Sequence, residues 1–185
     1  MPELRVDMFS TVDGFGSAGP QDAPYWGYGG PGLSAWVQAQ LQEDHVMLMG
    51  ATTYRLMSEI VATTEDPTFP RMAQLPKIVF SKTLKAPLTW ANTTIVDEPL
   101  ETAVPALKAK DGGLPMRTIG SPSLIRSLFR LGLVDRLRVM FFPTIHGSEG
   151  EGPVFADLPW LRLRLVATTT IDERLVLLDY RVGAE

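Results

Sequence analysis

The order of strand-like and helix-like segments is the feature that most constrains the fold of this chain. Up to about residue 142, short apolar runs typical of strands alternate with segments whose apolar residues recur at helical spacing. After residue 142 two strand-like runs follow one another. Alternating strands and helices build parallel sheets covered by helices, whereas consecutive strands pair in antiparallel fashion. We therefore expect an α/β protein with a mixed, mainly parallel sheet and a C-terminal antiparallel hairpin.

The expected elements can be placed along the sequence from these patterns. The expected strands cover residues 4–11, 45–49, 77–81, 93–97, 116–119, 136–142, 161–170 and 174–182. The apolar stripes of the expected helices cover residues 33–41, 54–61, 100–107 and 124–129. Two segments fit neither pattern. The stretch 14–32 has seven glycines and three prolines, which favours a loop bordering a site, and the proline-rich stretch 62–76 is an excursion between elements.

Length and composition exclude several classes of protein. The 185 residues show no repeat and no linker, which predicts a single domain, 1–185. A net charge of −4 argues against nucleic-acid binding, which needs a basic face. The sequence has no cysteine, no apolar run approaching the ~20 residues of a membrane span and no signal peptide. We expect a cytoplasmic enzyme or binding protein with no membrane partner.

Two turns of small residues, each between an expected strand and an expected helix, are candidate anion sites. They are Gly50-Ala51-Thr52-Thr53 and Gly120-Ser121-Pro122-Ser123. A helix N-terminus exposes backbone N–H groups and a partial positive charge, so it can hold phosphate. Taken alone, each turn favours simple capping of its helix over a site. A third turn, Ser81-Lys82-Thr83, also follows an expected strand, and the three together favour one phosphate-rich ligand.

Other polar residues support chemistry less directly. Asp13 ends the first strand in an Asp-Gly turn, where it is either a turn residue or an acid that contacts substrate. Trp26 lies in the glycine-rich loop 14–32 and is a candidate for lining a site. His45 and His146 have no partner at metal-ligand spacing, so we expect no metal. No Ser-His-Asp set and no nucleophile elbow is present.

Several motifs together resemble one known superfamily. The runs STVDGF, LMGATTY, KIVFSKTL, TIGSPSLIRSLFRLGLVDRLRV and PTIHGSEGEGPVF occur in an order similar to that of the dihydrofolate reductase superfamily. The chain looks most like the single-domain proteins that resemble the C-terminal reductase domain of the bifunctional riboflavin-biosynthesis deaminase-reductase. This resemblance implies a three-layer α/β/α fold, an NADPH-dependent reductase and a homodimer. The reaction that it implies is reduction of 5-amino-6-(5-phosphoribosylamino)uracil in riboflavin biosynthesis.

The resemblance also implies which residues bind. The cofactor-binding residues would be Gly50, Thr52, Thr53, Ser81, Lys82, Thr83, Gly120, Ser121, Pro122, Ser123 and Leu124. The nicotinamide would lie toward Gly14 and Trp26, which would also contact substrate, and Asp13 is the candidate catalytic residue.

Three departures from the family pattern keep alternatives open. Ala51 replaces the arginine of the first turn, Ile119 replaces a glutamate before the later glycine turn, and the first helix starts without an acid. These departures argue against folate as substrate. They also leave two other hypotheses: a non-catalytic nucleotide-binding or ligand-sensing protein, and a structural homodimer with a vestigial pocket.

Overall fold

The computed structural model describes residues 1–17, 24–110 and 112–183. The chain divides into two compact units, and each consists of two separate stretches of sequence. The first unit contains Met1–Val6 and Gln40–Val134, and the second contains Asp7–Ala39 and Asp135–Glu185. The first strand, β1 (Leu4–Thr11), has residues in both units.

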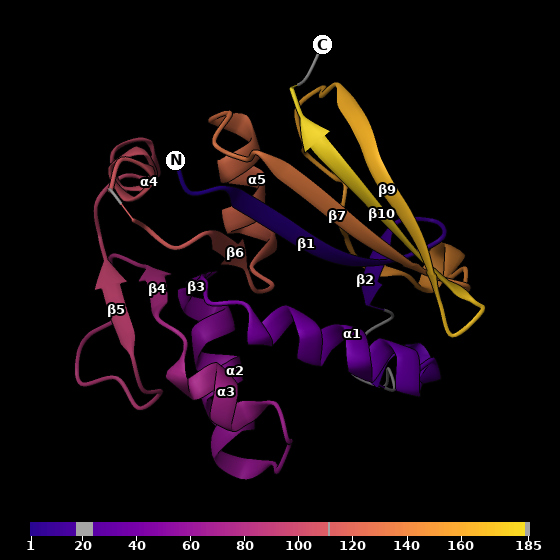
Figure 1. The fold of residues 1–185 in the computed structure, drawn as a ribbon, viewed down its shortest axis with the longest axis horizontal. Coiled ribbons are helices and arrows are strands. Elements are labelled where there is room, and N and C mark those ends of the chain that lie inside the picture. Colours follow the sequence, from indigo (N-terminus) through magenta and orange to yellow (C-terminus); the bar gives the residue numbers. More distant parts are fainter. Residues whose placement is uncertain (18–23, 111, 184–185) are drawn as a thin grey trace. The chain divides into compact units, whose positions relative to one another are not determined.

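The first unit is built on parallel strands. β3 (Val46–Gly50), β4 (Lys77–Phe80), β5 (Thr93–Val96) and β6 (Met116–Thr118) join the start of β1 in the order β5-β4-β3-β6-β1. The pairs β4–β5, β3–β4, β3–β6 and β1–β6 are all parallel, and β3, β4 and β5 lie next to one another in Figure 1. The carboxyl ends of these neighbouring strands therefore meet at one edge of the sheet.

The helices of the first unit connect these strands. They are α2 (Ala51–Thr63), α3 (Phe69–Gln74), α4 (Leu100–Lys108) and α5 (Pro122–Arg130). α2 contacts β3 and β4, and α5 contacts β3. α5 buries its predicted apolar stripe, Leu124, Ile125, Leu128 and Phe129. α3 was not predicted from the sequence, because it lies in the proline-rich stretch 62–76. Pro70 falls in its first turn, where proline is compatible with a helix.

The second unit contains an antiparallel region and a small extra sheet. β7 (Arg136–Phe142), β10 (Leu175–Val182) and β9 (Leu163–Ile171) pair antiparallel in that order, as Figure 1 shows. The short strands β2 (Phe15–Ser17) and β8 (Glu151–Pro153) form a separate pair that glycine-rich sequence had led us to expect as loop. Two short 3₁₀ turns, η1 (Pro24–Gly27) and η2 (Gly147–Glu149), complete the unit.

The first residues of α1 (Pro31–Gln42) are fixed by a carboxylate from the β9–β10 turn. Asp172 accepts hydrogen bonds from the backbone N–H of Gly32 (2.8 Å) and of Leu33 (2.9 Å). A side chain at Gly32 would place Cβ 2.6 Å from Asp172 Oδ1, and one at Gly30 would place it 2.5 Å from Oδ2. The glycines therefore make room for the carboxylate that caps this helix.

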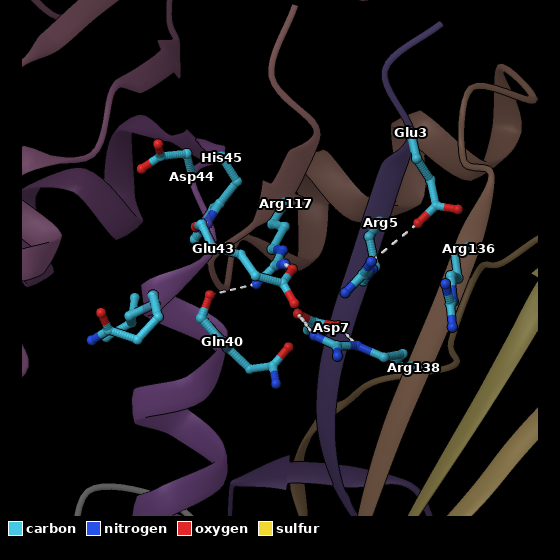
Figure 2. Close-up of polar contacts among 12 residues, drawn as sticks. Glu3, Arg5, Asp7, Gln40, Glu43, Asp44, His45, Arg117, Arg136 and Arg138 are labelled. Carbon is cyan, nitrogen blue, oxygen red and sulfur yellow. Dashed lines mark hydrogen bonds and ion pairs between the residues drawn. The ribbon is translucent and has the colours of Figure 1, made fainter.

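The last residues of α1 are satisfied by arginines from elsewhere in the first unit. Arg117 of β6 donates to the Gln40 carbonyl at 2.6 Å and pairs with Glu43, as Figure 2 shows. Arg71 donates to the carbonyl of Leu41 at 2.8 Å and to that of Gln42 at 3.3 Å. Cations at a helix C-terminus offset its partial negative charge, so these arginines end α1 without a glycine cap.

The fold class predicted from the sequence is confirmed. The strands form an eight-stranded mixed sheet with an antiparallel hairpin at its C-terminal end, and helices connect the parallel strands. The single-domain boundary, 1–185, stays a prediction. Within the described part of the chain, none of the helices has the length and apolar character needed to cross a bilayer.

Candidate functional site

The two glycine-containing turns of the first unit are joined by one serine hydroxyl. Gly50 ends β3 and Gly120 follows β6, and these two strands are neighbours. The Ser121 hydroxyl accepts a hydrogen bond from the Gly50 backbone N–H at 2.8 Å and lies 2.7 Å from Thr53 Oγ1. The starts of α2 and α5 are therefore in direct contact, although 71 residues separate Gly50 from Ser121 in sequence.

The backbone of the second turn has an uncommon conformation. Gly120 has φ 51°, and a Cβ there would lie 3.3 Å from Thr53 Cγ2. Ser121 has φ 64° and ψ 67°, the left-handed region that residues with a side chain seldom adopt. Such a conformation costs on the order of 1–3 kcal/mol and persists where the surroundings hold it. The buried Ser121 hydroxyl, with both of its contacts, provides that support.

The third turn lies at the same sheet edge, one strand away. Phe80, the last residue of β4, is in register with Gly50, and Ser81 follows directly. The Ser81 hydroxyl accepts hydrogen bonds from the N–H of Thr83 (3.2 Å) and of Leu84 (3.0 Å), so it closes its own turn. Lys82 is exposed. The three expected cofactor segments thus follow three neighbouring parallel strands of one unit.

The turns differ in the donors that they can offer to an anion. The Gly50 N–H is already bonded to Ser121, and Pro122 has no N–H. The donors left by helix geometry are the first N–H groups inside each helix, those of Ala51, Thr52 and Thr53 in α2 and those of Ser123 and Leu124 in α5. The Leu124 side chain itself is buried in the core, so only its backbone remains a candidate.

Thr118 is a residue at this edge that the sequence analysis missed. It is the last residue of β6, two positions before Gly120, and is 6% exposed. Its hydroxyl has no hydrogen-bond partner within the described ranges of the chain, which is unusual for a buried polar group. The signal available in the sequence was its position at the carboxyl end of a strand, directly before the glycine turn.

A surface hollow of about 320 Å³ lies elsewhere in the first unit. It is lined by Ala86, Leu88, Trp90, Ala91, Asn92, Thr93 and Ile95. None of the expected cofactor residues lines it. It therefore adds nothing to the case for a site at the three turns.

Asp13, in the second unit, acts as the anchor of two loops. Its carboxylate accepts hydrogen bonds from the Thr11 hydroxyl (2.6 Å) and from the backbone N–H of Gly147 (2.8 Å) and His146 (3.1 Å). The Thr11 hydroxyl, followed by the backbone donors of Gly147 and His146, lowers the pKa of Asp13 to about 2. Asp13 is therefore anionic at neutral pH, which favours its interpretation as a turn residue, and its catalytic role stays a prediction.

Gly14 and Trp26 also belong to the second unit. Gly14 has φ 91°, and its turn is held by a bond from its N–H to the Thr11 carbonyl. Trp26 has φ 50° and packs on Phe142, with ring centroids 4.8 Å apart. Its ring also lies edge-on to His146 at 6.2 Å. The expected substrate-side residues, Asp13, Gly14 and Trp26, thus belong to the same unit.

His146 is less exposed than its glycine-rich loop suggested. Its Nδ1 and the Nε1 of Trp26 are both shielded from solvent and lack a hydrogen-bond partner in the part of the chain that the structure covers. Spacing could not reveal its environment, because the contact with Trp26 joins positions 120 residues apart.

The parallel strands β3 and β6, which enter helices through Gly-, Ser- and Thr-containing turns, and the C-terminal antiparallel hairpin agree with the dihydrofolate reductase-like class, to which the family match assigns the chain. The chain belongs to one family within this class: the model of the RibD C-terminal domain matches residues 2–177. Members of this family are NAD(P)H-dependent reductases.

Individual relatives agree with this assignment. The uncharacterized protein YyaP of Bacillus subtilis (strain 168) is 28% identical over 188 residues, covering 96% of this chain and 93% of YyaP. A protein from Shewanella sp. PV-4, provisionally described as a riboflavin biosynthesis protein, has a similar structure, with a TM-score of 0.76 and 18% identity. That match covers 98% of this chain and 99% of the other. A pyrimidine reductase-like protein from Corynebacterium diphtheriae matches with a TM-score of 0.67 and 20% identity, over 100% and 93% of the two chains. These structural matches show the fold.

Proposed function

We propose that the protein is an NADPH-dependent reductase of a small heterocyclic substrate. The observation that carries the proposal is the direct contact of the Gly50–Thr53 and Gly120–Leu124 turns through Ser121, beside the turn that contains Lys82. Helix starts at the carboxyl edge of a parallel sheet suit a ligand with several phosphates. Membership of the RibD C-terminal domain family agrees with this chemistry.

The residues present at these turns fit a dinucleotide. The Thr53 hydroxyl and the first N–H groups of α2 and α5 would hold the phosphates that join its two halves. The buried Thr118 hydroxyl, which has no hydrogen-bond partner among the described residues, would be available to a bound ligand. Lys82 would pair with the 2′-phosphate, as the charged residue of the third turn. The nicotinamide supplies the hydride, while the protein binds and orients.

The substrate that we propose is 5-amino-6-(5-phosphoribosylamino)uracil, which the family relationship favours. Because Asp13 is anionic, it would contact the substrate only as a hydrogen-bond acceptor, and the proton required by the reduction would come from water. The similarity to the pyrimidine reductase-like protein of Corynebacterium diphtheriae supports the same class of substrate.

A titration tests the proposal. Adding the protein to NADPH and following nicotinamide fluorescence should give saturable binding, and NADPH oxidation with the aminouracil substrate should then give turnover. Lack of binding at millimolar NADPH would remove the proposal. Binding without turnover of the aminouracil, but with turnover of another pyrimidine or a pterin, would keep the reductase and correct the substrate.

Lys82 offers a sharper test of the cofactor. Lys82→Ala should weaken NADPH binding about fivefold, the expected loss of one exposed ionic contact with phosphate, and should leave NADH binding unchanged. Lys85→Ala is the matched control, because Lys85 is also exposed in the segment after β4. Isothermal titration calorimetry of both variants with both dinucleotides gives the comparison. Equal losses for the two lysines, or for the two dinucleotides, would contradict the assignment.

A second candidate function is a non-catalytic nucleotide-binding or ligand-sensing protein. Two departures from the family pattern favour it, since Ala51 replaces an arginine and Ile119 replaces a glutamate. The anionic Asp13 also favours it, because it has no proton to donate at neutral pH. Tight NADPH binding without oxidation across aminouracils, pterins and quinones would support this candidate over the reductase.

A further inference from the structure

We propose that Ser121 is a positioning residue that turns the Thr53 hydroxyl into a hydrogen-bond donor for a phosphate oxygen. This inference rests on the proposed function, because the phosphate is that of the dinucleotide.

The direction of the hydrogen bonds follows from counting protons. A serine hydroxyl has one proton to donate and two lone pairs that accept. One lone pair of Ser121 accepts the Gly50 N–H at 2.8 Å. Its proton needs an acceptor, because Ser121 is only 5% exposed, and the neighbouring acceptor is Thr53 Oγ1 at 2.7 Å. Were Thr53 to donate instead, the Ser121 proton would be buried without a partner, at a cost of about 1–3 kcal/mol by the general scale.

The consequence falls on Thr53. Its Oγ1 accepts the Ser121 proton, so the Thr53 proton is left to point away from Ser121. Thr53 is half-buried in the first turn of α2, where the backbone N–H groups and the helix dipole favour an anion. A hydroxyl that is obliged to donate suits a phosphate oxygen, which only accepts.

The backbone of Ser121 is consistent with this role. Ser121 is the N-cap residue of α5 and has the left-handed conformation, φ 64°, and its side chain makes no capping hydrogen bond to that helix. A Cβ added at the neighbouring Gly120 would lie 3.3 Å from the Thr53 methyl group, so glycine allows this close approach of the turn to Thr53. The chain thus holds an unfavourable backbone conformation at the residue that contacts both turns.

A double-mutant cycle tests the proposal. Ser121→Gly removes the hydroxyl while keeping a residue suited to positive φ, and Thr53→Val removes the hydroxyl while keeping the branched shape. We expect each single variant to weaken NADPH binding about fivefold in calorimetry, and the double variant to bind no more weakly than Thr53→Val alone. Ser127→Ala in the same helix, whose hydroxyl bonds the Ser123 carbonyl, is the control and should bind as the wild type does.

The alternative outcomes separate this inference from the proposed function. If Ser121→Gly weakens binding by the same factor with and without the Thr53 hydroxyl, Ser121 acts only through general structure and the inference is overturned. No effect of Ser121→Gly in either background overturns it as well. If the wild type binds inorganic pyrophosphate but not NADPH, and the Ser121 and Thr53 substitutions show the same coupling in pyrophosphate binding, the role of Ser121 is retained and the cofactor is removed. Wild type that binds neither would overturn both. Thermal unfolding of each variant verifies that it is folded.

Discussion

Asp13 shows how the environment of one carboxylate decides its chemistry. The sequence placed it in an Asp-Gly turn at the end of a strand, where a turn residue is slightly favoured over an acid or a hydrogen-bond partner of the substrate. The three donors that surround it, Thr11, His146 and Gly147, all stabilise the ionised form. Two of these are backbone groups more than 130 residues away, so the sequence alone could not decide between the two roles.

The lowered pKa of Asp13 makes a prediction about acid stability. Its folded pKa of about 2 lies below the value near 3.8 expected when unfolded, so its contribution is complete above about pH 4 and is lost as the pH falls through 2. Asp13→Asn should therefore lower the urea midpoint at pH 6, and the difference from wild type should shrink as the pH falls from 4 toward 2. A difference that grows on acidification would contradict the geometry described for the carboxylate.

Lys77 is a second residue whose surroundings override its usual behaviour. It is 1% exposed, and its ammonium donates to the carbonyls of Met72 and Leu75, both at 2.6 Å, at the end of α3. Burial lowers its pKa to about 8. The sequence had placed it at the start of a strand, where a lysine is ordinarily exposed. Its role in ending α3 became visible only with the fold.

At the scale of elements, local pattern predicted most strands and helices correctly. β1 was predicted at its observed bounds, because alternate residues Leu4, Val6 and Met8 are buried on one face. The stripes of α1, α2, α4 and α5 were also found. The pattern failed where the deciding partner is distant: β2 and β8 form only by pairing with each other, and α1 ends where Arg71 and Arg117 reach its carbonyls.

The start of α1 gives a prediction at the same scale. Gly32→Ala should force Asp172 away from the helix N-terminus, because the new Cβ would lie 2.6 Å from its Oδ1. We expect a loss of about 1–2 kcal/mol in the free energy of unfolding, the usual value of an N-cap. Gly29→Ala, where nothing lies within 4 Å of the added Cβ, should change it by less than about 0.5 kcal/mol.

Urea denaturation of both glycine variants measures this difference, and Asp172→Ala completes the comparison. With the carboxylate removed, Gly32→Ala should cost much less than it does in the wild type, since its main obstacle is gone. An undiminished cost in that background would mean that the glycine is needed for another reason.

At the scale of the whole molecule, the division into two compact units could not be predicted from the sequence. Each unit is assembled from an N-terminal stretch and a distant later stretch, so no linker or change in composition marks a boundary. The candidate cofactor turns were nevertheless predictable as a group. Each of them follows an expected strand, and parallel strands bring such turns to one edge. The hydroxyl that joins two of them was not predictable, because its contacts depend on the backbone of Ser121.

The homodimer implied by the resemblance remains a proposal, and β9 is the surface that we expect it to use. β9 is the last strand in the sheet order, and Leu163–Thr170 are all exposed along it. An edge strand with unpaired backbone groups and apolar side chains favours pairing with a second copy. Light scattering should give about twice 20.4 kDa for the wild type and a smaller mass for Leu165→Lys.

Leu56→Lys is the matched control for that measurement. Leu56, on α2, is 56% exposed and Leu165 is 55% exposed, so the two substitutions add a charge to equally accessible leucines. Loss of the dimer in both variants, or in neither, would rule out β9 as the contact surface.

The capping of α1 by Asp172 has one more consequence. The Asp172 carboxylate accepts the hydrogen bonds of the Gly32 and Leu33 N–H groups at this helix start. These donors are therefore not available to a free anion. Replacing Asp172 with glycine would leave a vacancy of carboxylate size, which formate or acetate from the solution could occupy and so restore the lost stability.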